Sequence, residues 1–182
     1  MSNGKGGPVA VGSTTMPSAS ALSQLFGEHY RRVLKAAYRI TGNLADAEDV
    51  SQGVFLRLAG AHEPVANAGS YLYRAAINGA LDVLRRRKTG ATEPLDEAAG
   101  APAGSSPEAA TGNRELGDFL RLAIGELAPR AAEMFTLRYV EELGNRDIAA
   151  MLGTSQAVVA VTLHHARSRL KRRLKEFRRE RR

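Results

Sequence analysis

Cationic and imidazole side chains gather near the C-terminus, where a helix would place them on one face. The members of this basic face, with the cations that flank it, are His164, Arg167, Ser168, Arg169, Lys171, Arg172 and Arg173. Guanidinium and ammonium groups hold nucleic-acid phosphates, whereas polar side chains on the same helix can reach base edges. The chemistry indicated is non-covalent binding of a polyanion.

Other chemistries lack the residues they need. The 182-residue chain has no cysteine, which excludes disulfides and thiolate sites, and its four histidines are not at zinc-ligand spacing with carboxylates. We find no nucleophile–base pair, metal cluster or phosphate-binding glycine loop. The sequence therefore predicts no enzyme activity, no metal and no cofactor.

Two helices and a tight turn must position the basic face. Ile148 and Leu152 lie four residues apart on one helical face, Gly153 suits a left-handed helix end, and Ser155 suits the N-cap of the next helix. The second helix repeats apolar residues at helical period, namely Val159, Leu163, Ala166, Leu170 and Leu174. This pattern is typical of a helix-turn-helix that lays its second helix in the major groove. The alternative is an ordinary helical hairpin with a solvated basic end.

The first half of this recognition helix is apolar. From Gln156 to Thr162 it offers no cation, and the first one is Arg167. Charged readout of guanine is therefore not available from this half. Two alternatives follow. In the first, binding relies on attraction of phosphates, hydrogen bonds from Gln156 and contacts with thymine methyl groups. In the second, the apolar residues pack within the domain, and the groove is read from Arg146 or Ser155.

The N-terminal half predicts two further amphipathic helices. Apolar residues at three-or-four spacing from Leu22 to Ile40 predict the first, which Gly42 ends. Residues 46–59 predict the second, with a buried stripe and a separate region of acidic, amide and apolar side chains. One interpretation is that the acids do no more than complement the positive end of the helix dipole. Phe55 and Leu56 beside the acids favour a second one, a surface that docks a protein.

A helix over 70–88 combines aromatic, amide and cationic side chains. Ser70 is its predicted N-cap and Gly90 its end, while Asn78 and Asp82 share one face. A buried aromatic pair with a basic C-terminus is one interpretation. The other is a surface for single-stranded nucleic acid, where bases stack on rings and the cations follow phosphates.

Charge is distributed unevenly along the chain. Residues 21–88 carry ten cations and six acids, residues 89–113 carry four acids and no cation, and residues 114–182 carry fifteen cations and nine acids. Two basic modules joined by an acidic, low-complexity linker indicate a nucleic-acid partner. Residues 1–20 are rich in Gly, Ser, Thr and Pro and are expected to be disordered. Without an 18-residue apolar run or a signal-peptide layout, we expect a cytoplasmic protein without membrane insertion.

Three ordered motifs resemble the extracytoplasmic-function sigma factors of the sigma-70 class. They are Asp46-Ala-Glu-Asp-Val-Ser-Gln-Gly-Val-Phe55, then Tyr71-Leu-Tyr-Arg-Ala-Ala-Ile-Asn78 with Asp82 and Arg85-Arg86, and Leu127-Ala-Pro-Arg through Leu152-Gly-Thr-Ser155. The resemblance covers about residues 22–88 and 115–175. Gly53, Ile77 and the stretch 158–163 depart from the family pattern.

The resemblance implies three binding surfaces. Core RNA polymerase would bind Asp46, Glu48, Asp49, Gln52, Phe55 and Leu56. The −10 promoter element would bind Tyr71, Arg74, Asn78, Asp82, Arg85, Arg86, Arg87 and Lys88. The −35 element would bind Arg146, Ser155, Gln156, Val158, Thr162, His164, His165, Arg167 and Lys171.

The fold expected is all-α, with two small helical domains joined by a flexible linker. Sigma region 2 would occupy 21–88, the linker 89–113 and sigma region 4 residues 114–182. The resemblance implies a factor that directs promoter recognition, promoter opening and transcription initiation, with core polymerase, promoter DNA and an anti-sigma factor as partners. The alternative is a stand-alone helix-turn-helix regulator with an N-terminal partner-binding domain.

Overall fold

The computed structural model describes residues 19–61, 65, 67–90 and 107–180, which form helices joined by short turns. The elements are α1 (Ala19–Thr41), α2 (Leu44–Ala59), α3 (Ala68–Lys88), α4 (Pro107–Gly125), α5 (Pro129–Tyr139), α6 (Asn145–Leu152) and α7 (Gln156–Glu180). No strand occurs in these ranges, so the all-α prediction is confirmed. The tail was expected over 1–20: residues 1–18 lie outside the described residues, whereas Ala19 and Ser20 begin α1. Most of the expected linker also lies outside the described residues, and α4 begins within the predicted linker range.

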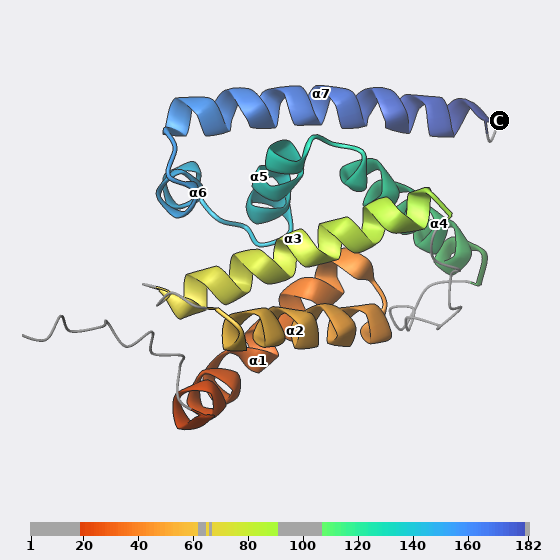
Figure 1. Ribbon diagram of the computed structural model, residues 1–182. Coiled ribbons are helices and arrows are strands. Elements are labelled where there is room, and N and C mark those ends of the chain that lie inside the picture. The colour runs from red at the N-terminus through yellow and green to blue at the C-terminus, as the bar shows by residue number, and fades with distance from the viewer. Residues whose placement is uncertain (1–18, 62–64, 66, 91–106, 181–182) are drawn as a thin grey trace, which may run out of the picture.

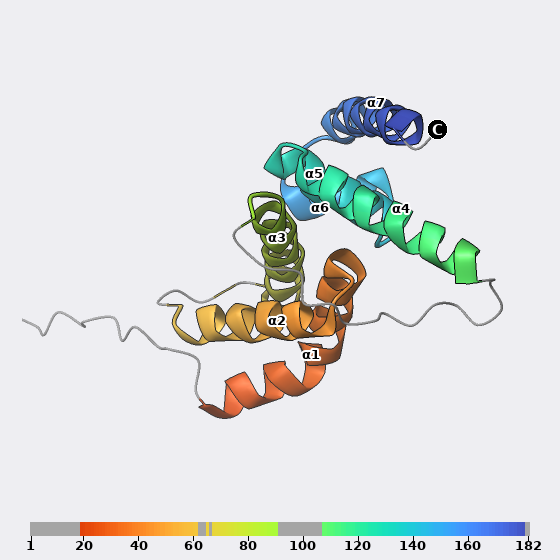
Figure 2. The same ribbon diagram turned by 90° about the vertical axis from the view of Figure 1, so that its right-hand side faces the viewer.

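Two groups of helices pack against each other along α3 (Figure 1). Helices α1, α2 and α3 contact one another, and α5, α6 and α7 form a second set that α4 joins. One face of α3 also contacts α4 and α5, so this helix belongs to the first group and forms the junction with the second (Figure 2). A single cluster of buried apolar residues runs through both groups.

Local chemistry explains where the first helices begin and end. Gly42, at φ +68°, ends α1 in the left-handed conformation, and Asn43 starts α2 by accepting a hydrogen bond from the Asp46 amide at 3.0 Å. Asn67 caps α3 in the same way through the Ser70 amide. The prediction of Ser70 as this cap was therefore wrong: Ser70 lies within the first turn, and the asparagine three residues earlier is the acceptor.

The helix-turn-helix follows the predicted boundaries. Pro129 occupies the first turn of α5, where its missing N–H costs nothing. Gly153 ends α6 at φ +60°, and the Ser155 hydroxyl accepts a hydrogen bond from the Val158 amide at 3.2 Å. The predicted stripe is buried at Val159, Leu163, Ala166 and Leu170. The recognition helix is thus fixed on α5 and α6, and its opposite face is left to solvent.

The junction between the groups includes a close approach that only a small residue allows. A Cβ placed on Gly125 of α4 would lie 3.1 Å from the Leu84 Cβ of α3. Leu81 and Leu84 are fully buried on this side of α3. The two groups therefore meet in a packed apolar contact as well as in polar ones.

Candidate nucleic-acid and protein interfaces

The exposed face of α7 has an apolar half followed by a cationic half. Val158 and Val161 are 49% and 57% exposed, whereas Val159 between them is fully buried. Gln156, His164, His165, Arg167 and Lys171 are also exposed, and Thr162 is half-buried. The idea that the apolar residues of this half all pack inside the domain is therefore wrong for Val158 and Val161. This face presents methyl groups, one amide and a run of cations to solvent.

Basic side chains from other helices hold the helix-turn-helix in place. Arg130 donates to the Leu152 carbonyl at 2.6 Å, and Arg74 donates to the Met151 carbonyl at 3.4 Å. These carbonyls belong to the last turn of α6, where no intrahelical donor remains. Arg146, in the first turn of α6, and Ser155, just after the end of α6, are both exposed. The predicted −35 residues therefore lie on one rigid pair of helices.

Glu126, next to the end of α4, connects three helices. It accepts hydrogen bonds from Arg173 of α7 at 3.1 and 3.2 Å and pairs with Lys88 of α3 at 3.0 Å. Burial alone would raise the pKa of Glu126, but the hydrogen bonds from Lys88 and Arg173 outweigh it and hold the pKa below its usual range. Lys88, predicted to contact −10 phosphates, is thus already paired with a carboxylate of the second group.

The acidic face of α2 is only partly as expected. Glu48, Asp49 and Gln52 are exposed, and Leu56 is 71% exposed beside them. Phe55, however, is only 9% exposed, and its ring lies 4.9 Å from that of Phe26. Its placement on the exposed side of the helix was therefore wrong, because a long α1 covers that part of α2. The open surface consists of carboxylates, an amide and one leucine.

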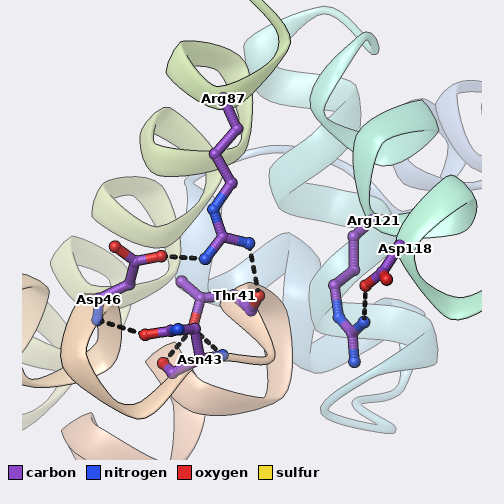
Figure 3. Close-up of polar contacts among 6 residues, drawn as sticks. All are labelled: Thr41, Asn43, Asp46, Arg87, Asp118 and Arg121. Atoms are coloured by element: carbon purple, nitrogen blue, oxygen red, sulfur yellow. Dashed lines mark hydrogen bonds and ion pairs between the residues drawn. The ribbon is translucent and has the colours of Figure 1, made fainter. Parts of the chain in front are cut away.

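Asp46 and Arg87, predicted to face different partners, pair with each other (Figure 3). Arg87 also donates to the Thr41 carbonyl at 3.0 Å, next to the Asn43 cap. The pair fastens the C-terminal turn of α3 to the turn between α1 and α2. Within the described residues, these two side chains therefore have a structural role in the first helix group.

The middle of α3 faces the second helix group. Arg74 Nε lies 3.0 Å from Glu133 Oε1, and Asn78 Nδ2 donates to the same oxygen at 3.2 Å. The Tyr73 hydroxyl donates to Glu141 Oε2 at 2.5 Å. Burial, followed by this hydrogen bond and the charge of Glu141, raises the pKa of Tyr73. Two of the predicted −10 residues, Arg74 and Asn78, therefore contact the chain's own carboxylate.

The remaining predicted −10 residues have mixed surroundings. Asp82 is exposed and pairs with Arg85 at 2.5 Å, and Arg86 is exposed on the same turn. Tyr71 is half-buried and packs against the core. The basic C-terminal turn of α3 is thus open only in part.

Glu133 and Glu141 were not predicted as functional residues. Glu133 is buried on α5, four residues before the fully buried Leu137, so it lies on the apolar stripe of that helix. A carboxylate at an apolar position was the available signal, because a buried acid needs a cationic partner. Arg130 lies 4.0 Å from Glu133 on the same helix, but the side chains that donate to its other oxygen, Asn78 and Arg74, lie 55 and 59 residues away in sequence.

Two kinds of feature are absent from the part of the chain that the structure describes. No group of three or more His, Asp or Glu side chains there could hold a metal ion. No helix there is long and apolar enough to cross a membrane.

Two protein families match this chain, one over the first helix group and one over most of the second. Residues 25–89 match the family described as Sigma-70 region 2, and residues 120–170 match the family described as Sigma-70, region 4. The RNA polymerase sigma-E factor of Streptomyces avermitilis is 31% identical over 145 residues, which cover 78% of each chain. The ECF RNA polymerase sigma factor SigE of Mycolicibacterium smegmatis is 33% identical over 81% of this chain and 59% of its own length.

A further relative and a solved structure are also sigma factors. The ECF RNA polymerase sigma factor SigG of Mycobacterium tuberculosis is 33% identical over 79% of this chain. The chain spans about half the length of the SigE and SigG relatives, 59% and 46% respectively. The sigma factor RpoE of Bartonella quintana, solved with the anti-sigma factor NepR, has a TM-score of 0.50 at 19% identity over 86% of this chain and 98% of that one. This last likeness shows the fold.

Proposed function

The chain belongs to the extracytoplasmic-function group of sigma-70 RNA polymerase sigma factors, and from this membership we propose that it binds core RNA polymerase and directs it to promoters. The polymerase supplies the chemistry of RNA synthesis, and this chain supplies promoter recognition and opening without a reaction of its own. Its work is in the cytoplasm, where polymerase and promoter DNA meet. The observation that carries the proposal is the exposed, partly cationic face of α7 on a rigid helix-turn-helix.

Each surface receives one role. The unit over 21–88 binds polymerase through the exposed Glu48, Asp49, Gln52 and Leu56 of α2, and binds the opened −10 strand through α3. The unit over 114–182 binds the −35 duplex through α6 and α7. The exposed cations Arg167, Arg169, Lys171 and Arg172 of α7 suit phosphates, and the exposed valines suit thymine methyl groups. An anti-sigma factor is proposed as a further partner, because the Bartonella sigma factor was solved with one.

Reconstituted transcription tests the proposal. Core RNA polymerase and the purified chain should together give run-off transcripts from discrete start sites in a library of genomic fragments, whereas core polymerase alone should not. The chain should also co-purify with core polymerase. If it leaves core polymerase unbound and binds specific duplex DNA unaided, it is a stand-alone regulator and the proposal is wrong.

The docking surface has its own test. Asp49→Lys with Leu56→Ala should reduce polymerase binding at least about tenfold, because both side chains are exposed and neither supports the core. Phe55 is left intact, since its buried ring contacts α1. Glu142→Lys, an exposed charge reversal outside these surfaces, is the control. Wild-type binding by the double variant would exclude this face of α2 as the docking site.

A further inference from the structure

Five side chains of the first helix group contact carboxylates of the second helix group. Four of these side chains meet two acids on or just after α5. Glu133 of α5 receives Arg74 and Asn78, and Glu141, just after α5, receives Tyr73 and Arg39. Arg39 Nη1 lies 2.9 Å from Glu141 Oε2. We call these two acids, with the four side chains that donate to them, the carboxylate clamp. The fifth side chain, Lys88, meets Glu126 at the far end of α3.

The donors of the clamp are the groups that would bind a nucleic-acid strand. A guanidinium, an amide N–H and a phenol hydroxyl all donate to anionic or carbonyl oxygens. Glu133 and Glu141 place carboxylate oxygens at these donors, and their side chains are only 5% and 6% exposed. A carboxylate and a phosphate both carry negative charge on oxygen, so the acids take the place that phosphates or base edges would need. The middle of α3 cannot hold a DNA strand while the clamp is closed.

Further contacts close the junction on either side of the clamp. Arg74 also donates to the Met151 carbonyl of α6, so the helix-turn-helix itself lies against α3. Arg121 of α4, which pairs with Asp118 (Figure 3), lies over Gly42, where an added Cβ would be 2.5 Å from the central carbon of the guanidinium. Gly125 meets Leu84 between these two places. The second helix group thus covers α3 along much of its length.

The clamp and helix α5 beside it contain polar atoms whose hydrogen-bonding needs are unmet. Glu141 Oε1 and the Thr136 hydroxyl are buried without a hydrogen-bond partner among the described residues. An unpaired buried carboxylate oxygen is costly, and a buried ion pair gains little over its desolvation penalty. The closed contact is therefore specific in geometry but weak enough for a competing partner to separate.

We propose that the free protein is autoinhibited by the carboxylate clamp: Glu133 and Glu141 act as an internal substitute for the −10 strand, and the second helix group must leave α3 before promoter DNA can bind there. The proposal rests on the function proposed above for α3. A binding-competent form that is only a fraction of the population lowers apparent DNA affinity by that fraction. Polymerase, by binding both units apart, would remove this inhibition.

Distance measurements between spin labels test the closed contact. Because the chain has no cysteine, Lys35→Cys on α1 and Lys175→Cys on α7 give two unique labelling sites, both exposed. The free protein should give one narrow distance distribution. Adding Glu133→Gln and Glu141→Gln should broaden it toward longer distances, because the neutral amides attract the arginines less. Glu142→Gln, an exposed neighbour, should leave it narrow.

A stronger variant covers the case in which glutamine keeps the hydrogen bonds. Glu141→Lys places a cation beside Arg39 and should open the junction by repulsion, with circular dichroism confirming that helical content is retained. A broad distribution of label-to-label distances in the doubly labelled protein without these changes would contradict the proposed closed contact. So would a narrow distribution that neither variant changes.

DNA binding tests the inhibitory role. A fluorescent single-stranded oligonucleotide of mixed sequence should bind the Glu133→Gln, Glu141→Gln variant about tenfold more tightly than the wild type, while duplex binding through α7 changes little. If the distances lengthen but single-strand affinity does not rise, the inhibitory role and the assignment of α3 to DNA both fall. If the distances do not change, the clamp fails and the sigma-factor proposal stands.

Discussion

The α3 and α7 surfaces carry similar side chains in opposite situations. On α7 four cations, Arg167, Arg169, Lys171 and Arg172, face solvent, and Arg173 is held by Glu126. On α3, in contrast, the cationic and amide groups Arg74 and Asn78 meet a carboxylate of the same chain. Arginine and asparagine indicate that an anion will bind, but they do not identify the anion. The difference teaches that a predicted nucleic-acid surface must be checked for an internal acidic competitor before it is considered open.

The largest effect should come from breaking the core that fixes both surfaces. Leu81 is fully buried on α3 within the continuous cluster, so Leu81→Ala should lower the free energy of unfolding by about 2–5 kcal/mol. Arg86→Ala, an exposed change on the same helix, should stay within about 0.5 kcal/mol. Chemical denaturation measures both. A cost for Leu81→Ala close to that of Arg86→Ala would mean that α3 is not held in a common core.

A smaller effect, on duplex-DNA binding, should distinguish the open α7 surface from the α3 surface that meets carboxylates of the same chain. Removing two exposed α7 cations with Arg167→Ala and Lys171→Ala should weaken duplex binding roughly tenfold and lower the salt slope by about 2, one for each phosphate contact. The control is Asn78→Ala on α3, whose side chain donates to Glu133 and should leave duplex binding by the free chain near the wild-type value. Fluorescence anisotropy at several salt concentrations gives both quantities. Equal losses from the two changes would contradict the difference between α3 and α7.

The smallest effect concerns how α7 reads sequence. Val158 and Val161 are exposed where a guanine-reading cation would stand, so replacing guanines in the −35 element should cost less than about tenfold, roughly 1.4 kcal/mol. Replacing thymine by uracil, which removes only the methyl group, should cost a few-fold. Open-complex yield on matched templates measures both. A guanine effect above about tenfold would show that another part of the helix-turn-helix enters the groove.

Features governed by local rules could be predicted from the sequence. Gly153 and Ser155 set the turn between α6 and α7, and Pro129 opens α5, because each acts within one or two turns of backbone. The buried stripe of α7 followed from its helical period. The predicted start of α3 was wrong by three residues, since serine and asparagine are both good caps and only geometry distinguishes them.

Features governed by distant packing could not be predicted. Phe55 follows the helical pattern of an exposed position, but α1 brings Phe26 over it. Arg87 and Asp46 were given separate partners, although the fold places them together across 41 residues. The carboxylate clamp joins residues up to 102 positions apart. Sequence spacing carries no information on such pairs, because they depend on how completed helices pack.

Hydroxyl-radical footprinting with mass spectrometry tests most directly that α3 is closed and α7 is open in the free chain. Tyr73 and Tyr139 are the same residue type, 4% and 44% exposed, so Tyr73 should oxidise at least about tenfold more slowly. Exposed His164 and His165 on α7 should be modified readily. In the Glu133→Gln, Glu141→Gln variant, or after core polymerase is added, the Tyr73 rate should rise toward that of Tyr139. Equal rates for the two tyrosines in the free wild-type protein would contradict the account.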